Sequence, residues 1–269
     1  MSLPSSEPPR TLGLSLGAGQ AWRILSALPA GVEVPGLAGV DYLVFRDAIG
    51  EAGDEDHYAL LVAAFAAPRL AGIGLVPEVD LYRADPYLIA RALTSLDILS
   101  GGRAGLLALD GPRGEARIGY ASTASDAGFV AEFVEVLGKL WNSWGEGALA
   151  RRWDENLYLD RDRLHEADHR GAHFAVRGPL PTPRAVQARP VVFATDHPSH
   201  AGIAATAAGV VSARRPPHGR WIRPVDAEGL ATAWADADGC LVEVPAVIAT
   251  AEAFAAFVAG LPGSGANHV

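Results

Sequence analysis

Residues 85–103 constrain the fold more than any other segment, because they contain a complete helix together with both of its ends. Pro86 presets the backbone angle of a first helical turn, and apolar residues recur at helical spacing as far as Leu99. Gly101-Gly102 then allow the left-handed turn that commonly ends a helix. The apolar run 104–109 follows directly. The segment therefore predicts a helix that leads through a tight turn into a buried strand.

Strand-like apolar runs alternate with helical patterns along most of the chain. The strand-like runs are 12–16, 42–45, 73–76, 104–109, 190–194, 210–211 and 239–244. The helical patterns are 60–69, 86–99, 127–144, 201–208 and 251–261. Strands that alternate with helices pair in parallel through right-handed crossovers. This order predicts an α/β fold, either a barrel or an open doubly wound sheet.

Composition limits the class of protein. With 269 residues, 49% of them hydrophobic, the chain can bury one large core, and a single α/β barrel of about 250 residues fits that length. A net charge of -9 argues against nucleic acid or an anionic membrane as the main partner. The single cysteine, Cys240, excludes an internal disulfide. Without a signal-like start or a run of about 20 apolar residues, we expect a cytoplasmic protein.

Acidic residues follow most of the strand-like runs. Barrel enzymes place their working residues just past the C-terminal ends of the strands. The residues at these ends are Arg46-Asp47, Pro77-Glu78 with Asp80 nearby, Asp110-Gly111, Thr195-Asp196-His197 and Glu243. The sequence therefore predicts a barrel mouth lined with carboxylates.

Three motifs carry a resemblance to a known family. The first is Ser95-Leu-Asp-Ile-Leu-Ser-Gly-Gly-Arg103. The second has three parts in order, Leu140-Trp-Asn-Ser-Trp144, Asp168-His-Arg-Gly-Ala-His-Phe-Ala-Val-Arg-Gly-Pro-Leu-Pro-Thr-Pro-Arg184 and Gln187-Ala-Arg-Pro-Val191. The third is Asp41-Tyr-Leu-Val-Phe-Arg-Asp47. The chain resembles the bacterial luciferase-like flavin monooxygenases, in particular the nitrilotriacetate and dibenzothiophene-sulfone monooxygenase branch. The resemblance implies a TIM-type (β/α)8 barrel with shortened loops. We expect one such domain over residues 11–262, with flexible tails at 1–10 and 263–269.

The resemblance also implies a site and partners. Reduced FMN from a separate flavin reductase would react with O₂ and a small organic substrate, and we expect a homodimer. The residues implied around the cofactor are Asp47, Asp110, Gly111, His197, Ser199 and Gly202. His197 is the expected proton donor, and the helix that begins near Ser199 would offer free amides to the phosphate.

Two positions depart from the family pattern. The fourth strand ends in Leu109-Asp-Gly instead of Val-Thr-Ser, and the phosphate loop reads 194–202, Ala-Thr-Asp-His-Pro-Ser-His-Ala-Gly, instead of Gln-Ala-Gly followed by serines. Like charges about 4 Å apart repel by about 4 kcal/mol at an effective dielectric near 20. A carboxylate beside the flavin phosphate would therefore weaken flavin binding. The alternative hypothesis is a flavin-free barrel that acts as a partner subunit.

A zinc-protease pattern is present but is rejected. His165-Glu-Ala-Asp-His169 fits H-E-x-x-H, which binds metal only inside a helix. Gly171 and the strand-like run 174–177 follow at once, although His173 could add a ligand, so a metal-assisted hydrolase stays the third hypothesis. Trp141 and Trp144 are expected to pack in the core or at a subunit contact.

Overall fold

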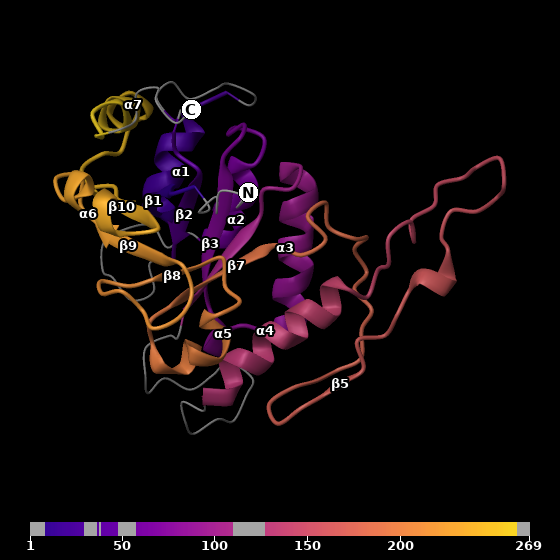
Figure 1. The fold of residues 1–269 in the computed structure, drawn as a ribbon. Coiled ribbons are helices and arrows are strands. Elements are labelled where there is room, and N and C mark those ends of the chain that lie inside the picture. The colour runs from indigo at the N-terminus through magenta and orange to yellow at the C-terminus, as the bar shows by residue number, and fades with distance from the viewer. Residues whose placement is uncertain (1–8, 30–36, 38, 48–57, 110–126, 263–269) are drawn as a thin grey trace, which may run out of the picture.

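The computed structural model describes residues 9–29, 37, 39–47, 58–109 and 127–262. Eight parallel strands close into a barrel in the order β1-β10-β9-β8-β7-β4-β3-β2 (Figure 1). The strands are β1 (Thr11–Gly17), β2 (Tyr42–Arg46), β3 (Gly74–Asp80), β4 (Gly105–Leu109), β7 (Val191–Thr195), β8 (Gly209–Val211), β9 (Trp221–Val225) and β10 (Gly239–Glu243). The predicted TIM-type barrel is confirmed.

Helices surround the barrel unevenly. They are α1 (Ala18–Ser26), α2 (Ala59–Ala66), α3 (Pro86–Ser100), α4 (Ala127–Trp141), α5 (Ala201–Ala204), α6 (Leu230–Asp236) and α7 (Ala251–Ala259), with the 3-10 turns η1 (Leu81–Arg83), η2 (Arg161–Arg163) and η3 (Pro198–His200). The helix predicted over 201–208 stops after its first turn, and residues 212–220 cross from β8 to β9 without a helix. The outer layer is therefore thinnest beside β7, β8 and β9.

The ends of α3 follow the local sequence. The side chain of Asp85 accepts hydrogen bonds from the backbone N–H groups of Tyr87 and Leu88, and Pro86 occupies the first turn. Gly101 ends the helix at φ 71°, in the left-handed region that side chains disfavour. The predicted helix and its stop are confirmed.

Two of the family-like motifs contact each other. Asp97, fully buried in α3, accepts hydrogen bonds from the backbone N–H of Gln187 at 3.0 Å and from the Gln187 side-chain amide at 2.5 Å. The same amide donates to the carbonyl of Ala104 at the turn before β4. Arg103 donates to the carbonyls of Ile73 and Ala67. These motif residues fasten α3 to the N-terminal side of the barrel, far from the mouth.

The segment 142–190 between α4 and β7 leaves the barrel, and part of it extends outward as an arm (Figure 1). It contains the 3-10 turn η2 and the short hairpin of β5 (His169–Arg170) and β6 (Ala175–Val176). The family resemblance implies a turn after the fifth barrel strand at 168–169 and a seventh barrel strand that ends near Thr195. Both expectations are wrong, because Val191–Thr195 pairs with β4 and is therefore the fifth barrel strand.

The two tryptophans at the end of α4 pack in the core. Trp141 and Trp144 are 4% and 8% exposed. The Trp141 indole N–H donates to the carbonyl of Ala90, and that of Trp144 donates to the carbonyl of Leu180. The core role predicted for both is confirmed.

The lower barrel interior is filled by Tyr42. A Cβ atom added at Gly13 on β1 would lie 2.3 Å from the ring of Tyr42, which is buried. We therefore expect Gly13→Ala to lower the free energy of unfolding by about 1–3 kcal/mol, measured by urea denaturation. Gly138→Ala is the matched control, since its Cβ meets nothing closer than 4.0 Å within α4 and should stabilise by about 0.5–1 kcal/mol. Equal effects of the two changes would contradict the tight contact.

Candidate active site at the barrel mouth

Strand alternation decides which side chains line the barrel mouth. Val44, Val76, Phe193 and Leu241 belong to a buried cluster inside the barrel, separate from the cluster under the helices. Successive strand residues point to opposite faces, so the residues two positions further along each strand also point inward. Because all eight strands are parallel, these inward residues meet at one rim.

One side of the rim is ionic. We call Arg46, Glu78 and Glu243 the ionic sector, because each is two positions beyond an interior residue of β2, β3 or β10. Arg46 and Glu243 form an ion pair of 2.9 Å across β1, the strand that separates β2 from β10. On β1 the facing residues are Gly17, paired with Arg46, and Ser15, paired with Glu243. Small side chains on β1 leave room for this pair.

Two further carboxylates lie beside the ionic sector. Asp47 accepts a hydrogen bond from the backbone N–H of Ala59 at 2.5 Å, so it caps α2. Burial raises the pKa of Asp47, and the nearby charge of Asp80 raises it further. Asp80 accepts from the backbone N–H of Tyr82 and pairs with Arg83 at 3.3 Å. This side of the rim is acidic, as predicted from the strand ends.

The opposite side of the rim is neutral. Leu109, Thr195 and Val211 continue the inward faces of β4, β7 and β8, and we call them the neutral sector. Leu109 and Val211 pack on the interior cluster. The mouth therefore has an apolar wall facing a charged wall.

The loop after β7 satisfies much of its own hydrogen bonding. Nδ1 of His197 accepts from the backbone N–H of Ser199 at 3.3 Å and lies 2.8 Å from the Ser199 hydroxyl. The backbone N–H of His200 donates to the carbonyl of His197, and Nδ1 of His200 accepts from the N–H of Thr195. The expectation of free amides at a helix beginning near Ser199 is therefore wrong for Ser199 and His200, and α5 is a single turn.

The other implied cofactor residues are distributed differently. Gly202 lies within α5, where an added Cβ would be 3.1 Å from Ala131 of α4, so its open side faces a helix. Asp47 lies on the far side of β3 and β4 from the β7 loop. Asp110 and Gly111 lie outside the described residues. Of the implied cofactor residues, the structure brings His197 and Ser199 together. It places Asp47 beside Glu78 and Asp80, away from these two residues.

Two strand-end acids have partners that the sequence did not suggest. Asp196 accepts a hydrogen bond from the hydroxyl of Ser212 at 2.6 Å, so it joins the ends of β7 and β8. Arg46 pairs with Glu243, although the sequence assigned neither a role. Counting two residues on from Val44 and Leu241 was the signal that could have found this pair.

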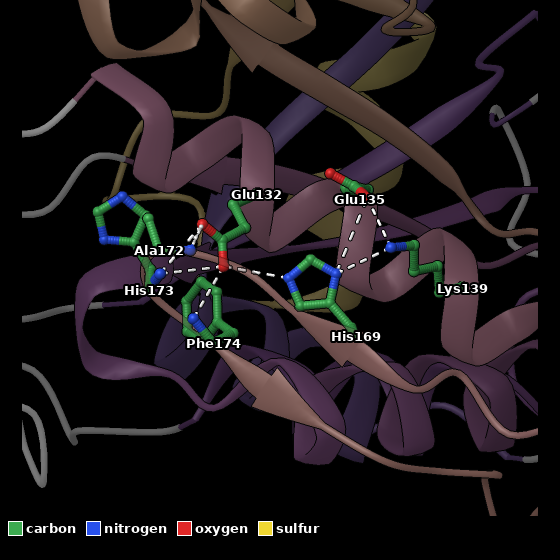
Figure 2. Close-up of polar contacts among 7 residues, drawn as sticks. All are labelled: Glu132, Glu135, Lys139, His169, Ala172, His173 and Phe174. Atoms are coloured by element: carbon green, nitrogen blue, oxygen red, sulfur yellow. Dashed lines mark hydrogen bonds and ion pairs between the residues drawn. The ribbon is translucent and has the colours of Figure 1, made fainter.

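His169 of the zinc-protease pattern has a structural role. It lies in β5, not in a helix, and its Nε2 is 3.1 Å from the carboxylate of Glu132 (Figure 2). That carboxylate also accepts from the backbone N–H groups of 172–174. On the other side, Nδ1 of His169 lies 3.0 Å from the ammonium of Lys139. His169 therefore anchors the hairpin to α4.

The described residues offer neither a metal cluster nor a membrane span. Over the described ranges, no group of three or more His, Cys, Asp or Glu residues could hold a metal ion. The helices within those ranges are all too short or too polar to cross a bilayer.

Comparison with known proteins adds a family. The family model described as luciferase-like monooxygenase matches residues 37–256. The chain is 35% identical over 150 residues to nitrilotriacetate monooxygenase component A of Aminobacter aminovorans, covering 53% of the chain and 33% of the relative. It is 37% identical over 141 residues to dibenzothiophene-sulfone monooxygenase of Rhodococcus erythropolis, covering 50% and 31%.

A solved structure with a similar fold is the EDTA monooxygenase of Chelativorans sp. BNC1. Its TM-score is 0.66 at 15% identity, over 93% of this chain and 92% of that one. In sequence, each match takes in about a third of the curated relative's length.

Proposed function

Because the chain belongs to the luciferase-like monooxygenase family, we propose that it is a flavin-dependent monooxygenase that uses reduced FMN and O₂ to oxygenate a small organic substrate. The family match carries the proposal, since it spans the barrel strands from β2 to β10. A flavin-free partner barrel is not favoured, because the sequence relatives reported above are named as monooxygenases.

The two walls of the mouth fit the flavin ring. The neutral sector offers an apolar surface to a flat ring, and Arg46 offers a cation to the negative charge of reduced flavin. Asp47, His197, Ser199 and Gly202 stay the proposed contacts to the rest of the cofactor, together with Asp110 and Gly111. Amides already used in the β7 loop make the phosphate end the weaker part of the fit. When bound, reduced flavin supplies the electrons that activate O₂.

The proposed partners follow from the same relatives. One relative is named component A, which supports a separate flavin reductase as the source of reduced FMN. Leu61 of α2 and Leu88 and Leu99 of α3 are exposed, which supports a homodimer through these helices. We place the enzyme in the cytoplasm, as the sequence predicts.

Flavin titration tests the proposal. We expect FMN to lose fluorescence on binding, and reduced FMN to bind more tightly than oxidised FMN because Arg46 faces a negative charge. Arg46→Gln should weaken binding of the reduced form by about tenfold, since a hydrogen bond to a charged group contributes about 1.5–3 kcal/mol, and should affect the oxidised form less.

The matched control is Glu252→Gln on α7, which is exposed and outside the mouth, so it should leave both affinities unchanged. If neither quenching nor thermal stabilisation occurs at high micromolar FMN, the proposed function is wrong.

A further inference from the structure

Of the two carboxyl groups in the ionic sector, Glu78 is the more buried, because Glu243 is exposed. On β3, Val76 belongs to the interior cluster, whereas Leu75 and Val79 belong to the cluster under the helices. Alternation therefore turns Glu78 inward, one layer above Val76. A carboxyl at this position faces whatever reactant the mouth holds.

The neighbours of Glu78 leave its charge poorly compensated. On β4 it pairs in register with Leu107, and the next inward residue there is Leu109, so that side is apolar. On β2, Arg46 is the nearby cation, but its guanidinium is bonded to Glu243 of β10 at 2.9 Å. Asp47 adds a like charge, whereas the charge of Asp80 on the same strand as Glu78 is paired with Arg83. Among the described residues, Arg46 is thus shared between two carboxylates.

These surroundings favour a protonated carboxyl near neutral pH. Burial raises the pKa of Glu78 to about 7, with Arg46 lowering it and Asp47 raising it. A general acid works best when its pKa is close to the working pH, because it then holds its proton and can still release it.

We propose that Glu78 is a catalytic acid of the barrel mouth, the residue that gives a proton to an oxygen atom of the bound reactants. The inference rests on the proposed monooxygenase function, in which one oxygen atom of O₂ leaves as water. Anionic reduced flavin would supply two electrons and one proton for that water, so one further proton is needed. The O–H bond of Glu78 breaks and a new O–H bond forms on that oxygen. The carboxylate left behind faces Arg46, and solvent at the mouth restores the proton.

His197 is the rival acid taken from the sequence. Its Nδ1 accepts the backbone N–H of Ser199, so this nitrogen holds the loop after β7 in place. Among the residues that the structure describes, no backbone N–H donates to Glu78, and its side chain points into the interior. The geometry therefore favours Glu78 over His197.

Titration of the flavin-free protein tests the acid directly. Carbon-13 NMR of labelled glutamate carboxyls, with Glu78→Gln to identify the resonance, should give one midpoint near the value of about 7. Arg46→Gln should move the midpoint up and Asp47→Asn should move it down, because the first removes a favourable charge and the second an unfavourable one. Glu252→Gln should leave it in place. A Glu78 midpoint that coincides with those of exposed glutamates would overturn the proposal.

Turnover then tests the role in catalysis. With reduced flavin supplied, Glu78→Gln should lower kcat by about 100-fold or more with little change in KM or in flavin affinity, and should remove the basic limb of the pH profile. Glu78→Asp should recover part of the rate, whereas His197→Gln should keep the limb. If Glu78→Gln binds flavin and keeps the wild-type rate and pH profile, the inference fails while the proposed function stands. If the wild type binds no flavin, the proposed function itself fails.

Discussion

Replacing Asp97 with alanine is expected to lower the free energy of unfolding by about 2–4 kcal/mol. The carboxylate is fully buried and accepts both the backbone and the side-chain N–H of Gln187, a residue 90 positions away. Its removal takes the acceptor away from the backbone N–H of Gln187 and leaves the side-chain amide with only the carbonyl of Ala104. Urea denaturation followed by tryptophan fluorescence measures the loss.

A double-mutant cycle separates this contact from general damage. Gln187→Ala alone should also lower the free energy of unfolding. The double variant should lose less stability than the sum of the two single losses, because the two side chains are hydrogen-bonded to each other. Asp97→Asn should lower the free energy of unfolding by an intermediate amount, since the asparagine amide keeps one acceptor oxygen but turns an N–H toward a donor. Additive effects, or a loss below about 0.5 kcal/mol for Asp97→Ala, would show that the contact does not hold the motifs together.

Replacing Glu132 with alanine should release the β5–β6 hairpin from α4. The carboxylate accepts hydrogen bonds from three consecutive backbone N–H groups and from Nε2 of His169 (Figure 2). Two of these four donor residues, Phe174 and His169, are buried. We expect a loss of about 2–4 kcal/mol, because buried donors without partners cost about 1–3 kcal/mol each. Hydrogen exchange at residues 172–174 should accelerate more than elsewhere in the chain.

Glu135→Gln is the matched control one turn away on α4. Glu135 is 56% exposed and pairs with Lys139, and such surface pairs contribute at most about 1 kcal/mol. Similar losses for Glu132→Ala and Glu135→Gln would contradict the anchoring role.

The charge of Glu132 adds a pH dependence. Burial alone would raise its pKa, but hydrogen bonds from His169, His173 and Phe174 hold the pKa below the ordinary value of 4.5. The stabilisation from this charge is present above that value and is lost as the pH falls through the folded-state pKa. The stability difference between wild type and Glu132→Gln should therefore narrow in acid.

Sequence was sufficient to predict the scaffold where local signals were strong. The helix that starts at Pro86 and stops at Gly101 has a proline, a periodic apolar face and a left-handed glycine, and it forms as predicted. The meeting of Asp97 with Gln187 could not be read from one sequence, because nothing local links positions 90 apart. The motifs on which the family resemblance rests contain residues that hold α3 against the barrel.

Weaker local signals explain the missed elements. β9, the seventh barrel strand, contains Arg223 and Pro224, which interrupt an apolar run, so this strand escaped prediction. α1 begins immediately after β1 at Gly17, with no loop to mark its start. α6 is only seven residues long. In each case barrel closure, a long-range property, fixes the element.

At the site, sequence predicted the kind of residue better than its role. The acidic rim was expected from the strand ends, and it is present at Asp47, Glu78 and Glu243. The pairing of Arg46 with Glu243 depends on two strands that are not neighbours, and on the small residues of β1 between them. Such coincidences require the closed barrel.

The division of the rim into an ionic sector and a neutral sector has a further consequence. Charges confined to one side of a low-dielectric opening create an electric field that crosses it, and fixed fields of this kind orient dipolar molecules. A reactant with unequal ends would therefore enter in one preferred orientation before any contact specific to its structure is made. The uneven distribution of charge around the rim thus sets the orientation in which a dipolar reactant enters the barrel.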